Sequence, residues 1–297
     1  MSLPPLPVIV NVGGGAASHA GDALREQVEG AFATAGRTIQ LELVDGDALA
    51  DAIAGHAGSG RVAVGGGDGT LATAAQGLSE KGDELAILPL GTRNHFAGQL
   101  GIPADLAAAA KIAVTGRVRR VDLGQAGERS FINNFSTGAY VDLVREREMS
   151  RLPKLAATLP AAWRTLRKLR ARRYELSIDG ETRTVETPLL FIGNNRYEVD
   201  EGRPTERAAL DEGLLSVYAA APLSRAALLV AAFHALVGRP RMGRDFVLDL
   251  SAREIRVNGP AASIDVALDG EPLRCELPLT VRLLPRALAV VSLPENR

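Results

Sequence analysis

Two kinds of hydrophobic pattern alternate along the first part of the chain. Residues 7–11 form a short, β-branched run that stops at three glycines, which predicts a buried strand. Residues 21–35 instead carry Leu24, Val28 and Phe32 at helical spacing, which predicts a helix. The same alternation predicts further strands at 38–44, 61–64 and 84–88, and further helices at 47–57 and 69–78. It implies a parallel sheet with helices on both faces, ending near Val121.

The pattern changes from about Ser130 onward. Short strand-like runs separated by turn signals follow at 130–136, 174–178, 182–187, 189–192, 214–219, 246–250, 254–257, 263–268 and 279–284. Such spacing is typical of an antiparallel sandwich or barrel. We therefore predict an α/β domain over residues 1–125 and a β-sandwich domain over 126–297, with the boundary near Gly124–Gly127. This prediction leaves open that the last residues of the chain belong to the first domain.

Composition narrows the class of protein. The 297 residues are 46% hydrophobic and 23% charged with a net charge of -1, so nothing suggests a disordered chain or a nucleic-acid partner. Cys275 is the single cysteine, and the N-terminus lacks the features of a signal peptide. The longest apolar run, 226–237, is shorter than the roughly 20 residues of a transmembrane helix. We expect a cytoplasmic protein with no transmembrane segment, whose membrane contact is peripheral to the inner face.

A glycine cluster gives the strongest chemical signal. Gly65-Gly66-Gly67-Asp68-Gly69-Thr70 directly follows a predicted strand and precedes a predicted helix. Glycine lets the backbone approach phosphate, and a helix N-terminus attracts anions. Asp68 would repel phosphate unless it binds Mg²⁺ or acts as a base. The alternative is a tight βα turn that needs glycine for its backbone geometry. No Walker A motif is present, and Ser18 stands where a dinucleotide fingerprint needs its third glycine.

A second loop follows the next strand. Pro89-Leu90-Gly91-Thr92-Arg93-Asn94 ends a predicted strand at the carboxyl edge of the sheet, where ligands of open α/β sheets collect. Thr92 and Asn94 can contact phosphate or ribose. An ordinary turn with Asn94 as a helix cap explains the same residues equally well.

These two segments resemble the paired nucleotide-binding motifs of the diacylglycerol kinase catalytic family, which includes bacterial lipid kinases and sphingosine kinases. The resemblance extends to Asn11, to the segments 131–138 and 210–215, and to Asp269-Gly270-Glu271, all in the family's order. The sequence departs from the family's pattern at His95, where many members have aspartate. It also departs at Asp142, which lies one residue later than the family's usual G-x-D spacing would place it. The resemblance implies a phosphofructokinase-like α/β nucleotide-binding domain followed by an antiparallel β-sandwich domain, with ATP bound in the cleft between them.

The resemblance also implies roles for individual residues. Its nucleotide-binding positions are Asn11, Gly66, Gly67, Asp68, Gly69, Thr70, Gly91, Thr92 and Asn94. Its catalytic positions are Asp269, Glu271 and Asp68, and its metal positions are Asp68, Glu271 and Asp211. We favour Asp269 as the base and Asp68 as the Mg²⁺–ATP residue, although the reverse is open. Taken alone, Asp269-Gly270 reads as a hairpin turn, and Asp211 as a turn aspartate.

A basic segment bears on the acceptor. Residues 145–174 carry ten Lys or Arg residues, with Leu155, Leu159, Trp163 and Leu166 at helical spacing. Such a helix suits an anionic membrane surface, and a solvated helix packed on its own domain is the alternative. The leading hypothesis is an ATP- and Mg²⁺-dependent lipid kinase acting on diacylglycerol or a related lipid. The alternatives are a kinase of a soluble acceptor such as NAD and a non-catalytic nucleotide-binding regulator. The oligomeric state stays open, with a homodimer among the alternatives.

Overall fold

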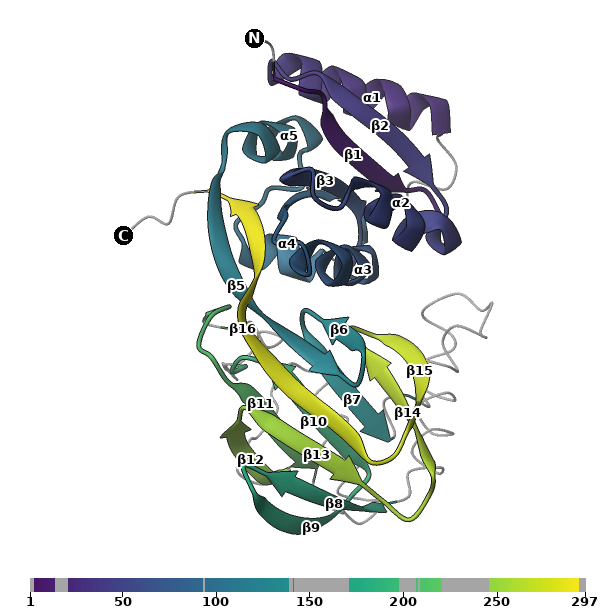
Figure 1. Ribbon diagram of the computed structural model, residues 1–297, viewed down its shortest axis with the longest axis vertical. Coiled ribbons are helices and arrows are strands. Elements are labelled where there is room, and N and C mark those ends of the chain that lie inside the picture. Colours follow the sequence, from purple (N-terminus) through teal and green to yellow (C-terminus); the bar gives the residue numbers. More distant parts are fainter. Residues whose placement is uncertain are drawn as a thin grey trace, which may run out of the picture. The chain divides into compact units, whose positions relative to one another are not determined.

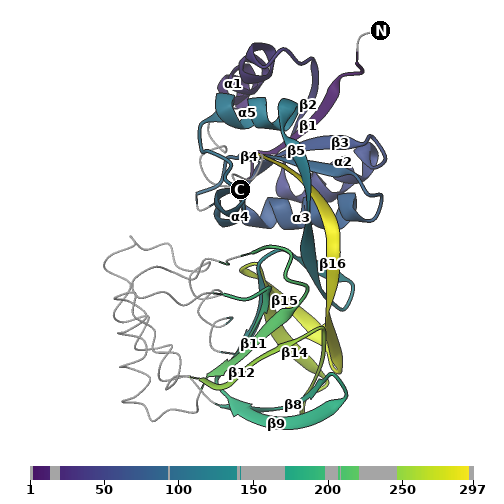
Figure 2. The same ribbon diagram turned by 90° about the vertical axis from the view of Figure 1, so that its left-hand side faces the viewer.

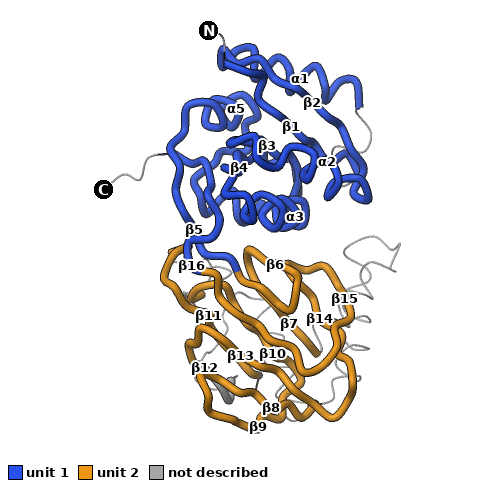
Figure 3. The backbone as a smooth tube through the Cα atoms, viewed as in Figure 1, with its two compact units in different colours: residues 1–123, 285–297 blue, residues 124–284 orange. Residues whose placement is uncertain are grey.

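The chain divides into two compact units (Figure 3). The computed structural model describes residues 3–13, 21–92, 94–138, 141, 171–197, 207, 209–220 and 246–293. Unit 1 comprises residues Met1–Leu123 and Pro285–Arg297, and unit 2 comprises Gly124–Leu284. Two long strands, β5 (Arg117–Ala126) and β16 (Leu279–Ser292), contribute residues to both units.

Unit 1 is built on parallel strands (Figure 1). Its strands are β1 (Leu6–Asn11), β2 (Ile39–Val44), β3 (Arg61–Gly66) and β4 (Glu84–Pro89), in the order β2-β1-β3-β4. The end of β16 adds to β4 in parallel, pairing Ala289 with Glu84. The helices are α1 (Gly21–Thr34), the 3₁₀ turn η2 (Gly46–Ala48), α2 (Leu49–His56), α3 (Asp68–Ser79), α4 (His95–Gln99) and α5 (Leu106–Thr115).

Helices cover both faces of this sheet. α1 packs with α5 on one face, and α2 packs with α3 on the other (Figure 2). Val8, Ile9 and Val10 are therefore fully buried although they point alternately to the two faces. α1 buries Leu24 and Val28 along one side, the face that its spacing predicts.

Unit 2 is an antiparallel sandwich. One sheet contains β16, β13 (Glu254–Asn258), β8 (Arg172–Ile178) and β9 (Glu181–Thr187), with β5 and β6 (Arg129–Phe131) beside β16. The other has the order β12-β11-β10-β7-β14-β15, namely Phe246–Ala252, Leu215–Ala220, Leu189–Asn194, Asn134–Gly138, Ser263–Leu268 and Glu271–Glu276. Leu176 and Val257 of the first sheet share a buried core with Phe135 and Val217 of the second. An α/β unit followed by a sandwich confirms the predicted fold class.

The structure corrects several predicted elements. The run 130–136 is not one strand: β6 ends at Phe131 and β7 begins at Asn134, because the amides between them donate elsewhere. β16 continues far beyond the predicted 279–284, and the strand β15 was not predicted. Helix α5 was also missed, although Asp105 caps it by accepting a hydrogen bond from the Ala108 amide at 2.8 Å. In the described part of the chain, no helix has the length and apolar composition needed to cross a bilayer.

Candidate functional site

The glycine loop between β3 and α3 leaves helix amides at its end. Gly67 precedes α3 in an extended conformation, with φ -92° and ψ -174°. The first hydrogen bond of the helix ladder runs from the Leu71 amide to the Gly67 carbonyl at 3.0 Å. The amides of Asp68, Gly69 and Thr70 therefore come before the ladder, at the positive end of the helix. This arrangement can bind an anion such as phosphate.

Glycine is required at two positions of these loops. A Cβ atom on Gly66 would lie 2.5 Å from the Cβ of Thr70. A Cβ on Gly91, in the loop after β4, would lie 2.4 Å from the Cα of Gly67 and 2.9 Å from its nitrogen. Real Cβ atoms essentially never come closer than 3.0 Å to other atoms, so no side chain fits at Gly66 or Gly91. The two predicted loops therefore contact each other through the backbone at Gly67 and Gly91. The two motifs that are far apart in sequence thus form one surface.

Asp68 joins the same two loops through its carboxylate. It accepts hydrogen bonds from the amides of His95 at 3.2 Å and Phe96 at 3.1 Å, the first residues of α4. Asp68 therefore caps α4 from another helix, while the side chain of the N-cap residue Asn94 makes no capping bond. Asn94 thus occupies the N-cap position of the turn, as the alternative interpretation expects, but its side chain does not cap the helix.

Asn94 instead closes its own loop. Its side chain accepts from the Gly91 amide at 3.0 Å and donates to the Pro89 and Gly91 carbonyls at 3.1 and 2.7 Å. These bonds hold Asn94 in the left-handed region, with φ 49°. A contact from Asn94 or from the exposed Thr92 to a nucleotide stays a prediction.

Asn11 completes this edge of the sheet. Its amide nitrogen donates to the Thr70 hydroxyl at 3.0 Å, and its side-chain oxygen accepts from the Gly13 amide at 2.9 Å. The ends of β1, β3 and β4 therefore lie together, as parallel neighbours require. The fold brings Asn11, residues 66–70 and Gly91 to one edge.

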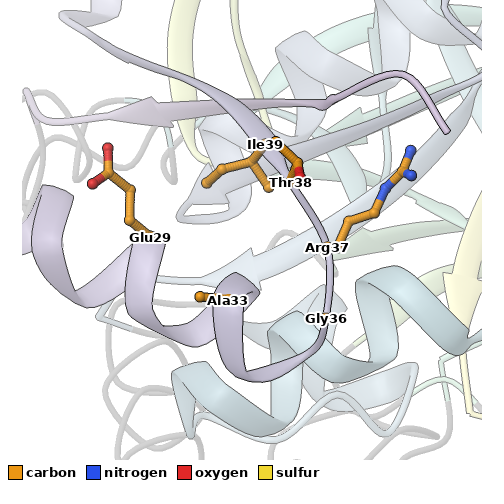
Figure 4. Close-up of a pocket in the computed structure, with 6 residues that line it drawn as sticks. All are labelled: Glu29, Ala33, Gly36, Arg37, Thr38 and Ile39. Carbon is orange, nitrogen blue, oxygen red and sulfur yellow. The ribbon is translucent and has the colours of Figure 1, made fainter. Parts of the chain in front are cut away.

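A separate hollow lies elsewhere on unit 1 (Figure 4). Its volume is about 380 Å³, and its lining residues are Glu29, Ala33, Gly36, Arg37, Thr38 and Ile39. These residues connect the end of α1 to the start of β2, so the hollow is at the amino edge of the parallel strands. None of the predicted site residues lines it.

In unit 2, Asp269 and Gly270 form the hairpin turn between β14 and β15. Their φ angles are 50° and 89°, so both residues adopt the left-handed conformation of the tight turn that Asp-Gly favours. The hairpin interpretation is therefore confirmed. Asp179-Gly180, between β8 and β9, has nearly the same φ angles, 48° and 92°, but Asp179 is exposed.

The Asp269 carboxylate also binds three backbone amides of another segment. One oxygen accepts from the Ile132 amide at 2.7 Å, and the other accepts from the amides of Asn133 at 2.7 Å and Asn134 at 2.9 Å. Burial raises the pKa of Asp269 to about 6, against the opposing effect of these hydrogen bonds and of the Arg207 charge. A partly buried carboxylate is thus held rigidly in the gap between β6 and β7.

Two residues missed by the sequence analysis surround that gap. The guanidinium of Arg207 is buried and lies 5.8 Å from the ring centroid of Tyr197. The Tyr197 hydroxyl donates to the Asn133 carbonyl at 2.9 Å. Burial raises the pKa of Tyr197 to about 12, while the Arg207 charge acts to lower it. Arg207 comes from a polar stretch without hydrophobic periodicity, so no local signal identifies it.

The remaining predicted metal residues, Glu271 and Asp211, both lie in unit 2. Glu271 is exposed at the start of β15, and Asp211 precedes Glu212, whose amide donates to the Asn195 side-chain oxygen at 3.0 Å. Among the residues that the structure describes, no group of three or more His, Cys, Asp or Glu side chains could hold a metal ion. Metal roles for Asp68, Glu271 and Asp211 stay predictions. Asp142 and the basic residues between 145 and 170 lie outside the described residues.

Comparisons with known proteins agree with this arrangement. Residues 5–126 match the family described as diacylglycerol kinase catalytic domain, and residues 136–292 match the YegS C-terminal NAD kinase beta sandwich-like domain. The chain is 33% identical over 298 residues to a protein of Pseudomonas fluorescens named "Probable lipid kinase YegS-like", with 94% of each chain covered. A protein of the same name from Pseudomonas aeruginosa is 32% identical, with 86% of each chain covered.

A solved structure extends the likeness to the fold. The crystal structure of a diacylglycerol kinase from Bacillus anthracis superposes with a TM-score of 0.70 at 20% identity, covering 98% of this chain and 97% of that one. The resemblance inferred from the motifs is confirmed.

Proposed function

Because this chain belongs to the diacylglycerol kinase-like family of lipid kinases, we propose that it transfers the γ-phosphate of ATP to a hydroxyl group of diacylglycerol or a related lipid. A kinase of this family is a phosphotransferase with an alcohol group as acceptor. ATP as the donor, Mg²⁺ as the metal and the identity of the lipid are parts of the proposal.

The contact between Gly67 and Gly91 is the observation that carries the proposal. It joins two glycine loops at the amino end of α3, where backbone amides and the helix dipole favour a polyphosphate. Asn11 and Thr70 border the same edge. A fold that needed only two tight turns would not require this approach of bare backbone.

Phosphoryl transfer needs little from the protein beyond position and charge. The acceptor oxygen forms a bond to the γ-phosphorus, the bond from that phosphorus to the β–γ bridging oxygen breaks, and ADP leaves. The hydroxyl proton passes to a carboxylate, for which we assign Asp269. Three amide hydrogen bonds fix the direction of this carboxylate, as a base requires.

The donor set is compatible with Mg²⁺. This ion is usually bound by one or two carboxylates together with substrate phosphates, rather than by a complete protein cage. Asp68, beside both glycine loops, is the carboxylate that we assign to it, with Glu271 as a second candidate. Bound Mg²⁺ would neutralise charge on the phosphates.

The basic segment at 145–174 supports a lipid acceptor. Its ten cationic residues and its apolar spacing suit peripheral contact with an anionic leaflet, at the cytoplasmic face. NAD is the second candidate acceptor, because residues 136–292 match a domain described as NAD kinase beta sandwich-like.

One assay distinguishes the acceptors. The purified chain is incubated with γ-labelled ATP and Mg²⁺, and with diacylglycerol in mixed micelles, ceramide in mixed micelles, or NAD. We expect label in diacylglycerol or a related lipid and none in NAD. Labelled NAD with unlabelled lipids would overturn the proposal.

A further inference from the structure

The gap between β6 and β7 is held from two sides by opposite charges. On one side, the Asp269 carboxylate accepts the amides of Ile132, Asn133 and Asn134. On the other, the Arg207 guanidinium donates to the Ile132 carbonyl at 2.6 Å and to the Asn133 side-chain oxygen at 2.8 Å. The carboxylate and the guanidinium therefore bind the same two residues, Ile132 and Asn133.

A single peptide group lies between the two charges. The Ile132 carbonyl and the Asn133 amide belong to the same peptide unit. Its oxygen accepts a hydrogen bond from Arg207, and its N–H donates a hydrogen bond to Asp269. A cation at the oxygen polarises this peptide and strengthens its N–H as a donor. Arg207 thereby acts on the carboxylate through the backbone.

Burial explains why an arginine is needed. Arg207 is only 6% exposed, and a cation buried this deeply is costly unless acceptors surround it. A third acceptor, the Asn194 carbonyl, lies 3.0 Å from Nη1. The planar fork of arginine can satisfy these acceptors together, whereas lysine carries one compact charge.

We propose that Arg207 is a positioning residue for Asp269, holding the 132–134 backbone in the conformation that binds the Asp269 carboxylate. This inference rests on the proposed function, in which Asp269 is the base. In this role Arg207 acts through the backbone and not on a reacting atom. Its role is to keep the carboxylate in one orientation.

A double-mutant cycle on kcat tests the inference. Arg207→Gln should lower kcat by about 10- to 100-fold with the KM for ATP little changed, because a carboxylate displaced by about 1 Å loses its alignment. In the Asp269→Asn background, Arg207→Gln should cause almost no further loss, since the group it positions is already disabled. Arg207→Lys keeps the charge and should recover part of the lost kcat. Fully additive losses, or equal losses for Gln and Lys, would assign Arg207 a structural role only and overturn the proposal.

Arg274→Gln is the matched control for removing a guanidinium from unit 2. Arg274 is exposed and bonds only to the Ser263 hydroxyl among the contacts described, at 2.9 and 2.8 Å. We expect its kcat to be unchanged.

Amide hydrogen exchange separates this inference from the assignment of the base. In folded Arg207→Gln, exchange in the peptide covering residues 131–135 should accelerate while the rest of β7 stays protected. If Arg207→Gln does not fold, the same exchange measurement is made on Arg207→Lys, for which we expect a smaller acceleration of exchange in the peptide 131–135. Unchanged exchange would overturn the positioning role whatever the activity. If exchange accelerates but Asp269→Asn keeps its kcat, the base assignment fails and the structural link between Arg207 and Asp269 stands.

Discussion

The contact between Gly67 and Gly91 is asymmetric. A Cβ on Gly91 would lie 2.4 Å from the Gly67 Cα, whereas a Cβ on Gly67 would lie 3.5 Å from the Gly91 Cα, an ordinary van der Waals distance. Alanine is therefore tolerated by the fold at one position and not at the other. This difference separates the effect of a methyl group on loop packing from its effect on the ligand.

Gly91→Ala should damage both stability and nucleotide binding. The methyl group forces the two loops apart, at a cost of about 1–3 kcal/mol for an overpacked contact. Gly67→Ala should leave the melting temperature nearly unchanged but weaken ATP binding, since its methyl group stands where phosphate would approach the backbone. Thermal denaturation and calorimetric titration with ATP measure the two effects.

Gly30→Ala serves as the control for these two variants. Gly30 is exposed within α1, and a Cβ there would meet nothing within 4 Å. Alanine should stabilise the helix by roughly 0.5–1 kcal/mol and leave ATP affinity unaltered. Wild-type ATP affinity in folded Gly67→Ala would show that the loop is not the phosphate site.

Asp68→Ala should combine a loss of helix capping with a loss of nucleotide affinity. The carboxylate accepts the amides of His95 and Phe96, so its removal should cost about 1 kcal/mol of stability. It should also weaken Mg²⁺-dependent ATP binding. Asp105→Ala removes the cap of α5 and should show a similar stability loss with normal ATP binding. Equal ATP affinity in both variants would remove Asp68 from the metal–nucleotide site.

Asp269→Asn should lower kcat by about 10²-fold or more with ATP affinity little changed, the pattern of a lost transition-state interaction. Asp179→Asn is a close control, because Asp179 occupies the same position of an Asp-Gly hairpin turn but is exposed. Steady-state kinetics with micellar diacylglycerol, and circular dichroism of both variants, measure the difference. Near-normal turnover in Asp269→Asn would rule out Asp269 as the general base and assign that role to Asp68.

Tyr197 should ionise at an unusually high pH in the folded protein. Burial raises its pKa to about 12 from the usual 10.0, so folding favours the protonated phenol. This preference stabilises the fold fully below pH 10 and is lost as the pH rises through about 12. Ultraviolet difference titration of the wild type against Tyr197→Phe should show one phenolate appearing near the higher value. Its appearance near pH 10 in folded protein would contradict the buried placement.

Neutralising Arg164, Arg167 and Lys168 together should weaken binding to anionic vesicles. Each basic residue near such a surface contributes on the order of 1 kcal/mol. Vesicle sedimentation at low salt measures the effect, with neutral vesicles as the control, and high salt should reduce the difference. Equal binding by the triple variant would exclude this segment from the membrane contact.

Local patterns in the sequence determined most of the α/β unit and much of the sandwich. The strand 7–11, the helix 21–35 and the glycine loop before α3 were predictable because periodicity and turn chemistry act between neighbouring residues. The Asp269-Gly270 hairpin was predictable for the same reason. The glycine-aspartate motifs also identified the family.

Contacts between distant residues were decided only by the tertiary structure. The break between β6 and β7 depends on hydrogen bonds from residues 132–134 to Asp269, which lies 135 to 137 positions away in sequence. Arg207 reaches the same backbone from a stretch with no periodic signal, and the end of β16 joins β4 across about 200 residues of intervening chain. A buried polar group takes whichever partner the folded chain supplies, so its identity is absent from any local pattern.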